Sequence, residues 1–141
     1  MDCGDNNLIG TWKLVSAVME DVATKEQLRL WGECPNGYLV LTQAGRWIVL
    51  QTAQGRAVPK TDDERAAAFR SMLGYSGKFR VEGDKIVIAV DIAWDEAWVG
   101  TEQVRFYKIE ADRLHIEAAP QAYANLGGKV LRGILTWARE A

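Results

Sequence analysis

Histidine and cysteine are scarce in this sequence of 141 residues, which contains one histidine and two cysteines. Cys3 and Cys34 are widely separated, and neither a C-x-x-C nor an H-E-x-x-H motif is present. Structural and catalytic zinc sites need a cluster of such ligands at short spacing. We therefore expect neither a metal site nor a cofactor.

The chain also lacks an excess of basic residues and any long apolar segment. Seventeen Lys and Arg stand against 19 Asp and Glu, which gives a net charge of −2 with both signs mixed throughout. Nucleic-acid binding needs a basic stripe or patch, and a membrane-spanning helix needs about 18–20 apolar residues. We therefore expect neither a nucleic acid nor a membrane as partner.

The first residues, MDCGDNN, are acidic and polar and lack the basic and apolar regions of a secretory signal. We expect a cytoplasmic protein in which residues 1–7 form a flexible tail and Cys3 and Cys34 are free thiols. Residues 8–141 are expected to form one domain, because the chain is too short for two ordinary cores. Its composition, 48% hydrophobic and 26% charged, is typical of a globular protein.

The sequence does contain a succession of short segments with the alternation of β-strands. A charged segment, residues 20–29, is a candidate for a further short strand or an arm. Thr61 and Glu64 have the spacing of a capping box and Gly74 is a stop signal, so one helix is expected over residues 61–73. Its single apolar stripe suggests that it covers a barrel end or packs on a flank. The expected strands are residues 8–19, 38–42, 46–51, 75–82, 85–94, 101–110, 113–118 and 129–139.

These strands follow one another with tight turns, such as those at Gly83-Asp84 and Ala111-Asp112. Eight or nine antiparallel strands commonly close into an up-and-down barrel, because closure removes the exposed edges. An orthogonal or open sandwich is the alternative. A barrel of this size either is filled by side chains or holds one small ligand.

Polar side chains alternate with apolar ones on two neighbouring strands, 85–94 and 101–110. Gln103, Arg105 and Tyr107 share one face of the second strand, and Asp91 lies on the smaller-residue face of the first. If these faces point inward, Asp91 is the obvious partner for a buried Arg105, and the group would anchor a ligand. If they point outward, the same residues make ordinary cross-strand pairs in water.

The wider pattern resembles the small bacterial and fungal lipocalin-like domain family of the calycin superfamily. The resemblance rests on the segments LIGTWKLVS, GYLVLT, YSGKFRVEGDKIVIAVDIA and WVGTEQVRFYKIEADRLHI and covers nearly the whole chain. It implies a compact barrel with a central pocket. It also implies that Gly10 and Trp12 pack beneath a basic residue of the last strand, Arg139, and close one end of the barrel. Many members carry histidine where this chain has Ile88 and Ala89.

The resemblance favours the inward orientation of the polar row on strand 101–110. Aromatic side chains near strand ends and the lone imidazole complete the candidate ligand-binding set. This set consists of Tyr38, Trp47, Tyr75, Asp91, Gln103, Arg105, Tyr107 and His115.

Three functions are compatible with these features. The first is non-enzymatic binding of a small, largely apolar molecule, by a monomer or homodimer, in a barrel with a few polar anchors. The second is an isomerase, cyclase or dehydratase acting on a polyketide- or terpenoid-like substrate, with Asp91, Arg105 and Tyr107 as catalytic residues. The third is a protein-interaction module that uses the helix or an edge strand.

Overall fold

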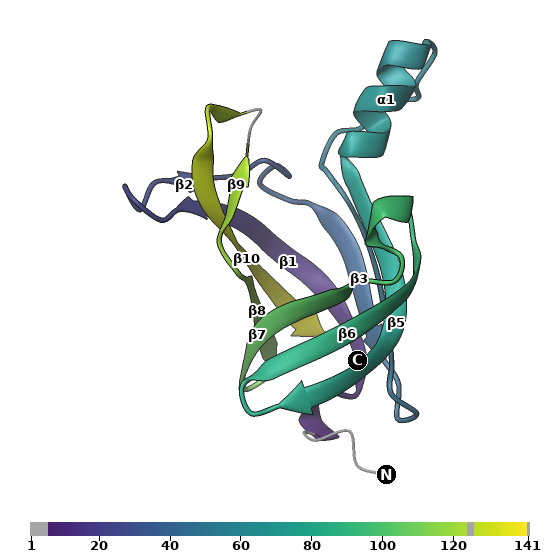
Figure 1. The fold of residues 1–141 in the computed structure, drawn as a ribbon, viewed down its shortest axis with the longest axis vertical. Coiled ribbons are helices and arrows are strands. Elements are labelled where there is room, and N and C mark those ends of the chain that lie inside the picture. Colours follow the sequence, from purple (N-terminus) through teal and green to yellow (C-terminus); the bar gives the residue numbers. More distant parts are fainter. Residues whose placement is uncertain (1–5, 124–125, 141) are drawn as a thin grey trace.

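The computed structural model describes residues 6–123 and 126–140 and consists mainly of one antiparallel sheet (Figure 1). The helical elements are α1 (Asp62–Arg70) and two short 3-10 helices, η1 (Asn6–Leu8) and η2 (Glu96–Trp98). The strands are β1 (Gly10–Asp21), β2 (Gln27–Leu28), β3 (Asn36–Leu41), β4 (Arg46–Thr52), β5 (Met72–Glu82), β6 (Lys85–Ala93), β7 (Glu102–Glu110), β8 (Arg113–Ala118), β9 (Gln121–Tyr123) and β10 (Lys129–Arg139).

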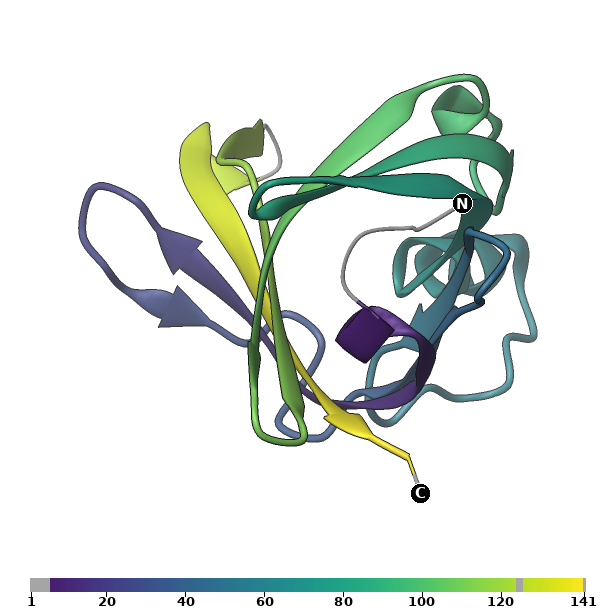
Figure 2. The same ribbon diagram turned by 90° about the horizontal axis from the view of Figure 1, so that it is seen from below.

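Pairing of the first long strand with the last closes the sheet into a barrel (Figure 2). The order β1-β3-β4-β5-β6-β7-β8-β10 returns to β1, so eight strands form the wall. Strand β2 pairs with β1 beyond the end of β3, and β9 pairs with β10 beyond the end of β8. The predicted all-β up-and-down barrel is confirmed, and the open sandwich is excluded.

The helix begins as the sequence predicts. The amide of Glu64 donates to the Thr61 hydroxyl at 3.1 Å, while the Glu64 carboxylate accepts from the amide of Lys60 at 2.7 Å. Three acidic residues occupy the first turn, where the helix dipole favours negative charge. These contacts satisfy amides that the first turn of a helix leaves without partners.

The predicted end of the helix at Leu73 is wrong. The helix stops at Arg70, because Met72 and Leu73 pair with β4 and begin β5. None of its residues is buried, and in Figure 1 it extends beyond the barrel at the upper end of β5. The helix therefore adds no buried side chain to the core, contrary to the expected cover or packed flank.

One end of the barrel is closed by Arg139 packed over Trp12. The guanidinium carbon lies 4.1 Å from the centroid of the indole ring, within the range of a cation–π contact. Arg139 also donates to the carbonyl of Ile9 at 2.9 Å and to that of Asn7, and the Trp12 indole donates to the carbonyl of Leu8 at 3.0 Å. The contact implied by the resemblance is thus present, and it ties the last strand to the entry of the first.

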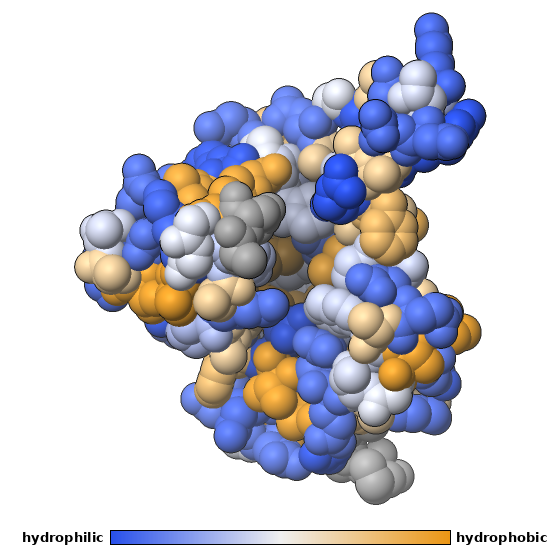
Figure 3. Space-filling model, turned by 45° about the horizontal axis from the view of Figure 1, so that its top comes forward, coloured by the Kyte–Doolittle hydropathy of each residue, from blue (hydrophilic) through white to orange (hydrophobic). Residues whose placement is uncertain are grey.

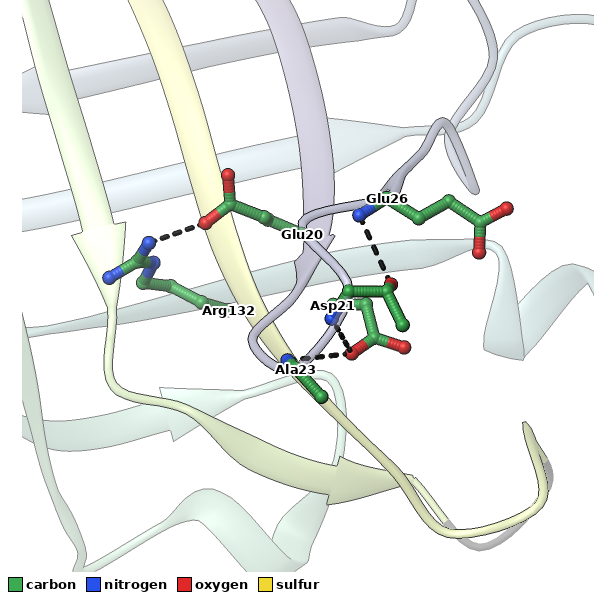
Figure 4. Close-up of polar contacts among 6 residues, drawn as sticks. Glu20, Asp21, Ala23, Glu26 and Arg132 are labelled. Carbon is green, nitrogen blue, oxygen red and sulfur yellow. Dashed lines mark hydrogen bonds and ion pairs between the residues drawn. The ribbon is translucent and has the colours of Figure 1, made fainter.

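At the other end, the distal parts of β1 and β10 form an arm with β2 and β9 (Figure 1). The buried Asp21 carboxylate closes the turn after β1 by accepting from the amides of Ala23 at 2.9 Å and Thr24 at 3.3 Å. Across the two strands Glu20 pairs with Arg132 (Figure 4). These contacts hold the arm in register beside the open end of the barrel.

A bulge on β6 interrupts the alternation of its side chains. The register with β5 shifts between Ser76 and Gly77, which pair with Ile92 and Val90 and leave Asp91 without an opposite residue. Val90 is buried inside the barrel, whereas Asp91 and Ile92 are both exposed. The bulge therefore turns two consecutive side chains toward water.

Most of the expected N-terminal tail, including Cys3, lies outside the described residues. Its last two residues, Asn6 and Asn7, belong to η1. The next residue, Leu8, is fully buried. Cys34 is exposed. No helix in the described ranges has the length and apolar character needed to cross a membrane.

The closed end yields a stability prediction at Gly10. Its φ of +139° is rarely adopted by other residues, and a Cβ there would lie 2.8 Å from Nη1 of Arg139. We expect Gly10→Ala to lower the free energy of unfolding by about 2–3 kcal/mol, measured by urea denaturation.

Gly55→Ala is the matched control, because Gly55 also has a positive φ, +75°, but has no atom within 4 Å of the added Cβ. Gly55→Ala introduces backbone strain without a steric contact, and we expect it to lower the free energy of unfolding by about 1 kcal/mol. Equal losses in the two variants would contradict a role for Gly10 in seating Arg139.

Candidate ligand-binding cavity

A cavity of about 390 Å³ lies within the barrel, on the side away from the Trp12–Arg139 closure. Its walls come from β4, β5, β7, β8 and β10, and Trp31, η2, β9 and the segment before β9 surround its mouth. Figure 3 looks toward this end and shows a hollowed surface with apolar residues inside the hollow. The volume is at the lower end of the range for ligand pockets, roughly 300–1,000 Å³.

Aromatic side chains form one wall of the cavity. The rings of Trp47 and Tyr75 stack with centroids 6.1 Å apart, and Tyr75 contacts Trp98 at 5.2 Å. Trp47 and Tyr75 come from paired strands and are only 3% and 4% exposed, and Trp137 on β10 is 2% exposed. Because these rings are held by packing on the core, the apolar wall is preformed rather than assembled around a ligand.

The opposing polar groups come from β7. Gln103 and Arg105 line the cavity, and Tyr107, the next residue of the same row, packs against the core. The intervening Val104 and Phe106 are 36% and 37% exposed. The inward orientation of this row is therefore present in the structure, although the apolar outer residues had favoured the reverse.

Among the described residues that line the cavity, Arg105 is the only charged one. Its Nη1 donates to the carbonyl of Val104 at 3.0 Å, and its Nη2 approaches Oε1 of Gln103 at 3.5 Å. Within the described ranges it makes no ion pair. Burial raises the pKa of Tyr75 above its usual value, and the nearby Arg105 guanidinium offsets part of that rise. Burial likewise raises the pKa of Tyr123, and Arg105 again offsets part of the rise.

Two indole nitrogens at the cavity are buried without a hydrogen-bond partner in the described part of the chain. These are Nε1 of Trp47 and Nε1 of Trp137. The Trp47 nitrogen lies near enough to the Tyr75 hydroxyl to lower that group's pKa slightly, but the pair falls outside hydrogen-bond geometry. An indole nitrogen can only donate, so each is a buried donor whose hydrogen bond is not made among the described residues, and neither opens onto the cavity.

The sequence was compared with models of known protein families. A model described as a lipocalin-like domain matches residues 9–140, which is nearly the whole chain. The chain belongs to the lipocalin-like domain family. No match was found among curated proteins. Membership agrees with the closed barrel and its internal cavity, and it supports ligand binding at the level of the family.

The expected position of Asp91 inside this lipocalin-like barrel is wrong. Asp91 lies on the outer face at the bulge, where its carboxylate pairs with Arg46 at 2.6 Å and accepts from the Ser76 hydroxyl at 2.8 Å. The expected ion pair between Asp91 and Arg105 is therefore absent. The proposed catalytic set of Asp91, Arg105 and Tyr107 is not assembled, because the three side chains do not share one side of the wall.

Tyr38 and His115 also lie outside the lipocalin-like barrel rather than at its cavity. Tyr38 is 44% exposed and lies near Lys13, whose Nζ is 5.1 Å from its ring. His115 lies 3.3 Å from the carboxylate of Glu110 and 3.4 Å from the hydroxyl of Thr136. Both residues alternate with buried neighbours on their strands, and this alternation turns them outward.

Several lining residues of the lipocalin-like domain escaped the sequence analysis. Gln51 had a usable signal, since it follows Trp47 and Val49 at every second position of β4. Tyr123 gave none, because it lies in a three-residue strand that has no periodic pattern. In the described residues, no group of three or more His, Cys, Asp or Glu is placed to hold a metal ion.

The position of Asp91 generates a prediction on stability and pH. Hydrogen bonds from Arg46 and Ser76 lower the pKa of Asp91 in the folded protein. The ionised carboxylate therefore stabilises the fold at any pH above the unfolded-state pKa, and this contribution is lost as the pH falls through the folded-state pKa. We expect Asp91→Asn to lower the free energy of unfolding at pH 7 by no more than about 1 kcal/mol, because the pair is partly exposed. The difference from the original protein should shrink below about pH 4 in urea denaturation.

Asp112→Asn serves as the control, since Asp112 is an exposed turn carboxylate that forms no ion pair with any of residues 6–123 and 126–140. The difference in free energy of unfolding between Asp112→Asn and the original protein should vary less with pH. A loss at Asp91 that grows toward acidic pH would contradict the assignment.

Proposed function

We propose that this lipocalin-like domain binds a small, largely apolar molecule in the barrel cavity without converting it chemically. The observation that supports the proposal is the cavity of about 390 Å³, with a preformed aromatic wall and a few converging polar groups. Small-molecule sites commonly combine a mainly apolar lining with a few polar groups that set orientation. The family supports the binding part of the proposal.

The chemistry of the lining supports binding rather than catalysis. Among the described residues that line the cavity there is no carboxylate, imidazole or thiol. General acid–base catalysis works best with a group whose pKa lies near the working pH. Burial moves the pKa of Tyr75 further from neutrality, so its hydroxyl stays protonated and acts as a hydrogen-bond partner. A cytoplasmic location and the state of monomer or homodimer remain predictions from the sequence.

A neutral fluorescent probe, N-phenyl-1-naphthylamine, tests the proposal. We expect saturable binding, with increased probe fluorescence on transfer from water into the cavity. Ala118 lies on β8 and faces the cavity, so Ala118→Phe should fill part of the space and weaken probe binding by about tenfold or more.

Ala89→Phe is the matched control, because Ala89 is exposed on the outer face of β6. It should leave the affinity for the probe within about twofold of the original, and thermal unfolding would verify that both variants are folded. Absence of saturable binding to the original protein, or equal effects of the two substitutions, would contradict a ligand site in the barrel.

A further inference from the structure

We propose that the ligand of this cavity is a small, apolar carboxylic acid whose carboxylate is bound by Arg105. This inference rests on the proposed function and narrows the class of molecule that the cavity binds. The class of ligand is narrowed by the charge of the lining, by the hydrogen-bond donors that it presents and by the size of the cavity.

The charge of the lining has one sign. Arg105 carries a permanent positive charge, and no Asp or Glu is among the residues that line the cavity in the described ranges. The carboxylate expected to neutralise it, Asp91, is on the outer face and is already paired with Arg46. A guanidinium that faces a mainly apolar space favours an anion as its partner.

The local contacts of Arg105 orient the side chain and leave part of it available. Thr101 accepts from Nε2 of Gln103 at 3.0 Å, which orients the Gln103 amide so that its oxygen faces Arg105 at 3.5 Å. Arg105 also donates to the carbonyl of Val104, and it lies close enough to the Tyr75 hydroxyl to lower the pKa of that group. The guanidinium has more N–H donors than these three contacts use. It can therefore bind a carboxylate through the paired geometry that arginine favours.

The other polar side chains of the lining each carry at least one hydrogen-bond donor; they are Gln51, Gln103, Gln121, Tyr75 and Tyr123. The hydroxyl of Tyr75, which burial keeps protonated, is such a donor at the aromatic wall. An ionised carboxylate only accepts hydrogen bonds, so it complements a donor-rich lining better than an amine, an amide or an alcohol does.

A carboxylate also fits better than a phosphate ester. A phosphate monoester carries about −1.5 to −2 charges at neutral pH, and a single arginine would leave part of that charge uncompensated in an apolar site. Apart from a few uncharged polar side chains, the remaining lining is aromatic and aliphatic, and it includes Trp98, Ile116 and Leu135. These surfaces suit a hydrocarbon or aromatic body of modest size.

Two probes of nearly equal shape test the charge preference, 2-naphthoic acid and 2-naphthalenemethanol, titrated by calorimetry at pH 7. We expect the acid to bind about tenfold or more tightly than the alcohol, because a charged hydrogen bond is formed only by the acid. Arg105→Gln keeps a polar side chain and should abolish the preference for the acid. We expect the affinity for the acid to fall by about tenfold and the affinity for the alcohol by less than about twofold. Arg105→Lys should retain part of the preference.

Arg113→Gln is the control for net charge, because Arg113 is exposed on β8 and forms no ion pair within the described part of the chain. It should change neither affinity. Equal binding of acid and alcohol, or a preference that survives Arg105→Gln, would overturn the inference while leaving the cavity as a binding site. If neither naphthalene compound nor the neutral probe N-phenyl-1-naphthylamine binds, both the inference and the proposed function are wrong.

Discussion

The pairing of β1 with β10 is the constraint on which the rest of this structure depends. It runs from Trp12–Arg139 to Asp21–Leu131 and turns a sheet with two free edges into a closed wall. Once the wall is closed, every strand has a defined inner and outer face, because successive side chains on a strand point to opposite sides. The Trp12–Arg139 contact then fills one end with side chains. The space for a ligand is left at the other end.

Much of the fold could be predicted from the sequence, because strand alternation and turn residues are local signals. The strand positions and the capped start of the helix belong to this class, whereas the closure by Gly10, Trp12 and Arg139 was implied by the family resemblance. The end of the helix could not be predicted, since Leu73 suits either a helix or a strand and its pairing with β4 decides between them. Strand β9 is too short to leave a periodic pattern.

The faces of β6 and β7 show where local signals are insufficient. Both faces of β6 are largely apolar, so alternation alone did not indicate which one is inside, and the bulge at Asp91 changes the pattern partway along. On β7 the apolar Val104 and Phe106 are exposed, although Val104 also borders the cavity. The polar Gln103 and Arg105 line the cavity and are less exposed, which is the reverse of ordinary patterning. A strand that departs from patterning at a cavity is expected where function rather than stability determines the residues.

The cavity and the Arg105 guanidinium beside it are not explained by stability alone. An eight-stranded barrel is narrow enough to be filled by side chains, so an open space requires small residues. Ala118 and Gly133 supply them: a Cβ added at Gly133 would lie 3.8 Å from that of Ala118, and both residues line the cavity. A positive charge facing such a space without a carboxylate lowers stability, and an apolar side chain at Arg105 would avoid that penalty. Stability therefore explains neither the empty volume nor the charge beside it, whereas the binding of a small acid that we propose would account for both.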